Sequence, residues 1–90
     1  MKNLKWEDLK FDPHQVVKGG VACRVEFENG EWCSIVGAQY DADGRCGGLY
    51  GNGNTSFEIC SSSTEKTRNL VKGWLSRTQV IRHLNYLKNK

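Results

Sequence analysis

The sequence has little proline, few histidines and no long apolar run, and each shortage excludes a class of protein. One proline against ten glycines favours tight turns and hairpins over a helical bundle. No stretch approaches the roughly 18 apolar residues of a transmembrane helix. The N-terminal "MKNLKWEDLK" also lacks the continuous apolar segment of a secretion signal. We therefore expect a cytoplasmic protein that has no membrane partner.

Signatures of metal binding and catalysis are missing as well. The four cysteines stand 10, 13 and 14 residues apart with no Cys-x-x-Cys pair, whereas structural zinc sites draw their ligands in close pairs. We expect reduced cysteines that fill strand positions, with no metal and no cofactor. The sequence has no Gly-x-Ser-x-Gly elbow and no Gly-Lys-Ser/Thr phosphate loop. It therefore predicts a protein that is not an enzyme, although a Cys-His pair such as Cys60 with His83 stays open.

The residues that are present describe one small globular domain. The composition is 38% hydrophobic and 26% charged, which is ordinary for a folded protein. A chain of 90 residues can bury one modest core and little else. We predict a single domain over residues 1–90.

A β-hairpin is predicted over residues 21–40. The first strand, "VACRVEFE" at 21–28, alternates apolar and polar residues as a half-buried strand does. The pair Asn29-Gly30 predicts a two-residue type I′ turn, followed by a returning strand over 31–40.

The length of this turn decides which way the second strand faces. A two-residue turn pairs Trp32 with Phe27 and leaves Cys33 and Ile35 on the opposite face. A three-residue turn reverses the faces and brings Cys33 opposite Phe27, because a slip of one residue inverts a strand. We favour the two-residue turn, since Asn-Gly is the pair that it requires.

The second half of the chain predicts another hairpin and a terminal helix. "LYGNGNTSFEIC" at 49–60 indicates a shorter hairpin with its turn at "GNGN". For 65–75 we prefer a short helix to a fifth strand, although Gly73 weakens a helix by about 1 kcal/mol. Ser76 and Gln79 have capping-box spacing. They precede apolar residues at helical intervals, which predicts a helix over 77–88.

The predicted fold is α+β, with an antiparallel sheet of about four strands in two hairpins, packed by the C-terminal helix. The helix has one apolar stripe and covers one sheet face. The other face is left for an N-terminal segment carrying Trp6 and Phe11, or for a partner. An apolar face that stays open is also compatible with a homodimer.

Charge is unevenly distributed along the chain. Residues 61–90 carry seven basic groups and one acid, whereas residues 1–60 carry six basic and nine acidic groups. The basic segment could steer the protein toward an anionic partner, either nucleic acid or an acidic protein surface. We select as candidate partner-binding residues Glu26, Glu28, Glu31, Tyr40, Asp41, Asp43, Tyr50, Arg77 and Arg82.

Three segments resemble a group of small phage and prophage accessory proteins. They are "WEDLKFDPH" at 6–14, "GGVACRVEFENG" at 19–30 and "VKGWLSRTQVIRHL" at 71–84. The resemblance covers most of the chain, but its motifs are structural. Small phage proteins of this kind act by covering a functional surface on a host protein, and anti-CRISPR proteins are similar in size and architecture.

The resemblance therefore implies an inhibitor of a host bacterial defence complex. It would bind through one sheet face, the loops at 41–55 and the basic helix. The chain departs from the group in its glycine-rich second hairpin and its basic terminal third. The alternative is a phage-encoded nucleic-acid-binding or DNA-metabolism accessory protein that uses the basic C-terminal segment.

Overall fold

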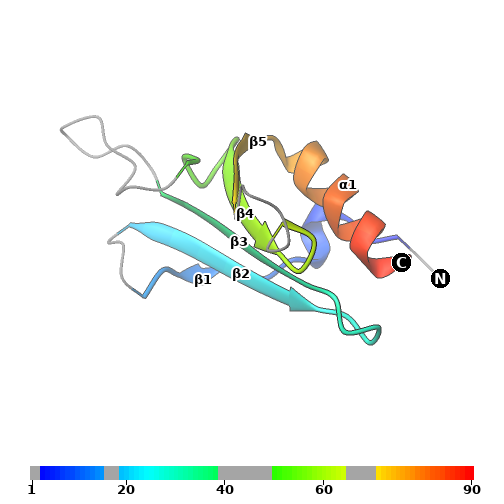
Figure 1. Cartoon of the computed structure of the whole chain (residues 1–90). Helices are drawn as coiled ribbons and strands as arrows, with labels where there is room; N and C mark the ends of the chain where they lie inside the picture. The colour runs from blue at the N-terminus through cyan, green and yellow to red at the C-terminus, as the bar shows by residue number, and fades with distance from the viewer. Residues whose placement is uncertain (1–2, 16–18, 39–49, 65–70) are drawn as a thin grey trace.

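The chain folds as a five-stranded antiparallel sheet with one helix packed on it (Figure 1). The computed structural model describes residues 3–15, 19–38, 50–64 and 71–90. The strands lie in the sheet in chain order, so that each pairs with its sequence neighbour. The elements are η1 (Trp6–Asp8), β1 (Asp12–Pro13), β2 (Gly20–Glu26), β3 (Trp32–Ala38), β4 (Phe57–Ser61), β5 (Lys72–Leu75) and α1 (Arg77–Lys88). The α+β prediction is confirmed, with five strands in place of four.

The first hairpin forms with a different turn from the one we favoured. The Phe27 N–H donates to the Glu31 carbonyl at 2.8 Å, which closes a three-residue loop over 28–30. Gly30 has a φ of 87°, the left-handed conformation that such loops place at their last residue. The two-residue turn at Asn29-Gly30 was therefore wrong.

The observed register places Cys33 and Ile35 on the inner face of the sheet. Ile35 lies opposite Cys23, and Trp32 lies opposite Glu26. The faces are thus those of the three-residue alternative, although the loop begins one residue earlier than in that alternative. Trp32 does not share a face with Phe27.

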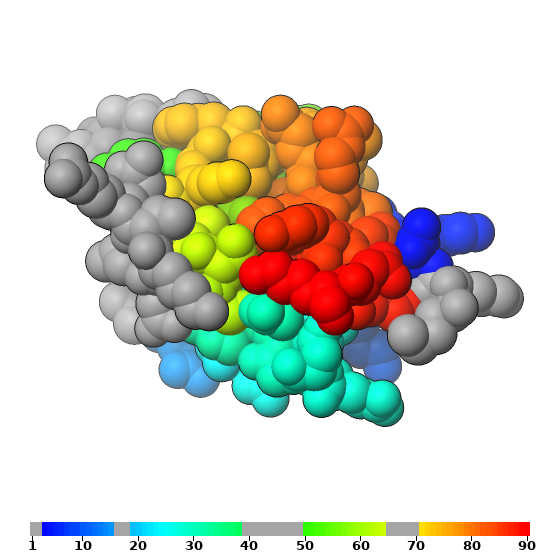
Figure 2. Space-filling view, turned by 45° about the vertical axis from the view of Figure 1, so that its right-hand side comes forward, coloured from blue at the N-terminus to red at the C-terminus, as the bar shows by residue number. Residues whose placement is uncertain are grey.

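The side chain of Asn29 explains why the two-residue turn does not form. Its Oδ1 accepts from the Glu31 N–H at 3.0 Å, and its Nδ2 donates to the Leu87 carbonyl at 2.9 Å. Leu87 is near the end of α1, and the red end of α1 lies against the hairpin tip in Figure 2. Asn29 therefore ties the hairpin to the helix instead of forming a type I′ turn.

A single core lies between the inner sheet face and α1. Its fully buried members come from three strands and the helix: Cys23, Cys33, Ile35, Phe57, Ile59, Val80, Leu84 and Leu87. Trp6 and Phe11 also pack here, with ring centroids 4.9 and 5.6 Å from that of Phe57. The N-terminal segment therefore shares the helix side of the sheet (Figure 1), and the expectation that it covers the opposite face was wrong.

The outer sheet face carries charged and half-buried side chains. The guanidinium of Arg24 lies 4.6 Å from the centre of the Trp32 ring and pairs with Glu26 at 2.9 Å. Trp32 and Val36 are half-buried. The Arg24 side chain therefore covers part of the apolar surface that Trp32 brings to this face.

The predicted second hairpin is not present in the described part of its sequence. Residues 50–56 form turns, and only β4 follows. The Oδ1 of Asn52 accepts three backbone N–H groups, those of Asn54, Thr55 and Ser56, at 2.8, 2.8 and 3.1 Å. A side chain that satisfies these donors removes them from a strand ladder. Residues 39–49, which include the rest of the prediction, lie outside the described residues.

The preferred helix at 65–75 was wrong in its described part. Residues 72–75 form β5, the edge strand beside β4, with Leu75 opposite Phe57 and Lys72 opposite Ile59. The pairing is irregular between these two pairs. Trp74 has a φ of 56°, which no right-handed helix accommodates. Residues 65–70 lie outside the described residues.

The terminal helix is confirmed at the predicted bounds, Arg77–Lys88. The Ser76 hydroxyl accepts from the Gln79 N–H at 3.2 Å, and the Gln79 side chain accepts from the Ser76 N–H at 2.8 Å. This reciprocal capping box satisfies two donors at the helix start. No helix in the described part of the chain is long and apolar enough to cross a membrane.

Candidate partner-binding surface

Exposed aromatic side chains gather around β5. Among the described residues, the large apolar side chains that remain exposed are Tyr50 at 53%, Trp74 at 52% and Tyr86 at 56%. Trp74 belongs to β5, and its N–H donates to the Tyr50 carbonyl at 2.6 Å. Tyr86 lines a groove with Lys72 and Leu75, the two ends of the same strand. Trp74 is therefore bonded to Tyr50, whereas Tyr86 lies in the groove between the same strand and α1.

We use the name β5 surface for these aromatic residues together with the basic side chains of the groove. Its members come from β5, from α1 and from the turn before β4. They are Tyr50, Lys72, Trp74, Arg82, His83 and Tyr86.

Trp74 is presented on a strained backbone. Its φ of 56° lies in the left-handed region, which costs a residue with a Cβ about 1–2 kcal/mol. The pairing of β5 with β4 is also irregular. An irregularity of this kind twists an edge strand and so discourages edge-to-edge pairing with other chains. About half of the Trp74 side chain nevertheless faces solvent. Its burial in the core therefore does not offset the whole energetic cost of the left-handed backbone. Strain of this kind is concentrated at functional sites.

Tyr50 is held in place from two directions. Its N–H donates to Oε1 of Glu58 at 3.3 Å, and its carbonyl accepts from Trp74. Gly73 lies directly below it: a Cβ built on Gly73 would stand 2.3 Å from the Cβ of Tyr50. A residue without a side chain is therefore required at position 73.

The groove between β5 and α1 is basic. It has a volume of about 370 Å³ and is lined by Lys72, Leu75, Gln79, Arg82, His83 and Tyr86. Within the described part of the chain, neither Lys72 nor Arg82 forms an ion pair. Residues 71–90 contain no Asp or Glu at all. Within the described residues, the positive charge at this groove therefore has no counterion.

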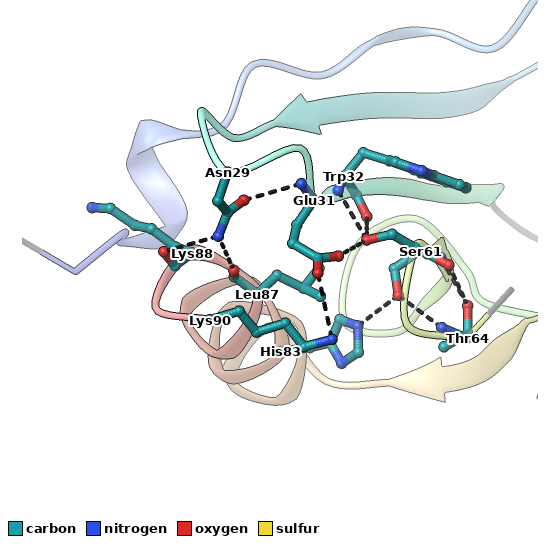
Figure 3. A network of polar contacts seen from close by, with 10 residues as sticks. Asn29, Glu31, Trp32, Ser61, Thr64, His83, Leu87, Lys88 and Lys90 are labelled. Carbon is teal, nitrogen blue, oxygen red and sulfur yellow. Dashed lines mark hydrogen bonds and ion pairs between the residues drawn. The ribbon is translucent and has the colours of Figure 1, made fainter. Parts of the chain in front are cut away.

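His83 connects the groove to a buried polar network (Figure 3). Its Nε2 lies 2.9 Å from the hydroxyl of Ser61, which also accepts from the Thr64 N–H at 3.2 Å. Burial lowers the pKa of His83 below its ordinary value, and the charges of Lys72 and Lys90 lower it further. The imidazole is therefore mostly neutral at pH 7.

The Ser61–His83 contact has the spacing of a nucleophile and its base, but the hydroxyl is out of reach. Ser61 is 0% exposed, so a substrate carbonyl cannot approach its oxygen. The partner of His83 in this contact is Ser61, whereas the pair left open by the sequence was Cys60 with His83. We interpret the contact as structural, because it fixes α1 against β4.

The thiols of the described residues also show no sign of chemistry. Cys23, Cys33 and Cys60 are free. Burial, and after it the neighbouring Cys60 and Cys23, raise the pKa of the Cys33 thiol to about 12, which makes it a poor nucleophile. Cys46 lies outside the described residues. Within those residues, no three His, Cys, Asp or Glu side chains come close enough to hold a metal ion.

The three glutamates selected from the sequence lie at the first hairpin. Glu26 is exposed and pairs with Arg24, and Glu28 is exposed at the hairpin tip. Glu31 accepts from the hydroxyl of Ser62 and lies 3.5 Å from the Lys90 ammonium (Figure 3). Two of the three are thus engaged within the protein, and none belongs to the β5 surface.

The other selected residues divide between the β5 surface and a structural role. Tyr50 and Arg82 belong to the β5 surface. Arg77 does not: its guanidinium donates to the carbonyl and side chain of Asn54 at 2.8 and 3.0 Å and lies 5.1 Å from the centre of the Trp6 ring. Arg77 therefore ties the helix to the turns at 50–56. Tyr40, Asp41 and Asp43 lie outside the described residues.

The candidates selected from the sequence did not include Trp74, Lys72, His83 or Tyr86. Trp74 had been assigned to the apolar positions of a helix. The adjacent Gly73 was the available signal, because glycine inside a strand indicates a bulge or the close approach of another backbone. Tyr86 falls outside the apolar stripe of α1, whose buried members are Val80, Leu84 and Leu87.

No protein-family model, no curated protein and no solved structure matches the chain. The chemistry of the β5 surface therefore carries the functional conclusions. It offers exposed aromatic rings and two cations that form no ion pair with any described residue, a combination suited to contact with an anionic partner.

Proposed function

We propose that the chain is a small non-enzymatic phage-type protein that inhibits a host bacterial defence complex by stoichiometric contact through the β5 surface. The observation that supports this most is the pair of half-exposed aromatic side chains at the edge strand, Trp74 with its strained backbone and Tyr50 bonded to it, together with Tyr86 in the groove that the same strand lines. Trp, Tyr and Arg are the residues that dominate binding energy in protein interfaces. The segment 71–84, which carries part of the resemblance to phage accessory proteins, includes Trp74 and Arg82.

The aromatic residues have enough free area to support a useful affinity. Large aromatic side chains bury roughly 150–250 Å² each. About 100 Å² of each ring is left for a partner, which corresponds to about 2.5 kcal/mol per ring before the costs of association.

A second candidate is a phage-encoded nucleic-acid-binding accessory protein. The observation that favours it is the charge of residues 71–90, which contain five basic residues and no acid. Two of those residues are committed elsewhere, Arg77 to Asn54 and Lys90 to Glu31. Of the other three, Lys72 and Arg82 line one groove, and contact of these two with phosphates would give a logarithmic salt dependence with a slope of about −1.8 on duplex DNA.

A binding assay with purified bacterial defence effectors tests the proposal. The expected result is a complex of fixed stoichiometry that survives moderate salt and blocks the effector's attack on its target. Trp74→Ala should dissociate the complex, whereas Lys10→Glu, a change on another part of the surface, should leave it intact. A chain that inhibits no effector, or that is retained by generic DNA with a steep salt dependence, would contradict it.

A further inference from the structure

We propose that the groove between β5 and α1 is the docking site for an acidic peptide segment of a protein partner. This inference rests on the proposed function and adds the chemistry of the partner. The groove is lined on the strand side by Lys72 and Leu75 and on the helix side by Arg82 and Tyr86. It therefore combines two positive charges with apolar surface.

The charges of the groove favour an anionic occupant. Lys72 comes from β5 and Arg82 from α1, and neither has an ion-pair partner within the described residues. Two like charges that line one groove repel each other, and a bound carboxylate between them replaces that repulsion with attraction. Among the other cations of α1 and the C-terminus, Arg77 is bonded to Asn54 and Lys90 lies 3.5 Å from Glu31.

The surroundings favour a peptide over a nucleic acid. A strand of nucleic acid is held by a row of cations that follows its phosphates, and among the described residues only Lys72 and Arg82 bring lysine or arginine to this groove. Glu58 lies on the other side of β5, where it accepts from the Tyr50 N–H, and its carboxylate disfavours a long polyanion. Leu75 gives the groove an aliphatic patch, and the Nε2 of Gln79, whose Oε1 accepts from the Ser76 N–H, can donate to a peptide carbonyl.

The pKa of His83 should change when a ligand occupies the groove. Its ring lines the groove and faces Ser61 of β4, Lys72 of β5, and Tyr86 and Lys90 of the C-terminal segment, while Glu31 partly neutralises Lys90. A carboxylate bound near Lys72 opposes the cations that lower the pKa of His83. Binding should therefore raise that pKa.

Titration of the full chain with a synthetic peptide tests the inference. The probe is a blocked peptide of alternating glutamate and leucine, followed by ¹⁵N–¹H spectra and by the imidazole signals of His83. We expect shifts at the amides of the groove and a rise in the pKa of His83. Arg82→Glu and Lys72→Glu should each weaken binding by about tenfold or more, because a bound carboxylate then meets a like charge. Lys10→Glu makes the same change in net charge and should bind as the wild type does.

Three results would overturn the inference. The shifts could fall outside the groove, Arg82→Glu could bind the peptide as well as Lys10→Glu does, or an oligodeoxythymidine of about 12 nucleotides could displace the peptide from the same amides. The folded state of each variant is checked in the same spectra. The peptide assay needs no host protein. Peptide binding without inhibition of any effector would therefore contradict the proposed function but not the inference about the groove. Inhibition that depends on Trp74 but not on Arg82, without peptide binding, would contradict the inference about the groove but not the proposed function.

Discussion

Tyr50 packs directly on Gly73, whose missing side chain leaves room for it. A Cβ at position 73 would stand 2.3 Å from the Tyr50 Cβ and 3.2 Å from the Tyr50 carbonyl oxygen. We therefore expect Gly73→Ala to lower the free energy of unfolding by about 1–3 kcal/mol, the usual cost of overpacking. Urea denaturation measures the change.

A double-mutant cycle separates this contact from the general effect of replacing glycine. Tyr50→Gly removes the Cβ that would collide, so Gly73→Ala should cost much less in that background. A coupling free energy of about 1 kcal/mol or more is the expected sign of direct contact. An equal cost in both backgrounds would mean that Tyr50 and Gly73 do not touch.

Trp74 should reveal its backbone strain in a comparison of two variants. Trp74→Ala and Trp74→Gly both remove the indole ring, but only glycine adopts a φ of 56° freely. We expect the glycine variant to be more stable than the alanine variant by about 1 kcal/mol, despite the greater entropy of glycine in the unfolded chain. Matched urea curves give the difference. If alanine proves equal or better, position 74 is not left-handed.

Protonation of His83 should destabilise the fold in mild acid. Its pKa is lowered in the folded protein, first by burial and then by Lys72 and Lys90, so below about pH 6.5 the unfolded chain binds more protons than the folded chain. Stability should therefore be complete above that pH and fall as the pH drops toward the folded-state pKa.

Unfolding curves at pH 7.5 and pH 5.5 measure this effect. His83→Gln should flatten the dependence in that window, because glutamine can bond to Ser61 without taking up a proton. His14→Gln, which replaces the other histidine of the chain, is the matched control. An unchanged pH profile in His83→Gln would assign the effect to other groups.

The observed register of the first hairpin predicts an order of thiol reactivity. Cys33 is 0% exposed with its pKa raised to about 12, whereas Cys60 is half-buried on the outer face. Brief treatment with iodoacetamide at pH 8 should alkylate Cys60 well before Cys33, as read by peptide mass spectrometry. In urea both should react. Fast labelling of folded Cys33 would support an outward Cys33, as in the two-residue turn.

The parts of the fold that sequence could predict are those that local signals determine. The helix over 77–88 follows from a cap and an apolar spacing that lie within one segment. The hairpin existed, but its register depends on Asn29 binding the carbonyl of Leu87, 58 residues away. A turn preference read from two residues cannot include that contact.

The same distinction explains what could be predicted of the candidate site. Tyr50 and Arg82 were selected as an aromatic and a basic residue in polar surroundings, and both belong to the β5 surface. Trp74 was missed because β5 depends on the packing of Gly73 against Tyr50, which joins segments 23 residues apart in sequence. Arg77 was selected by its charge, but its guanidinium donates hydrogen bonds to Asn54 and lies over the Trp6 ring. No local sequence pattern reveals these contacts.

Phage plating tests the central claim most directly. The chain is expressed in bacteria that carry an active CRISPR immunity system, and the plating efficiency of a targeted phage is compared with that of an untargeted one. We predict that the wild-type chain and Lys10→Glu restore plating of the targeted phage, and that Trp74→Ala and Arg82→Glu do not, at equal levels of folded protein. Full protection by the immunity system in the presence of the wild-type chain, or equal activity of all four proteins, would contradict the account.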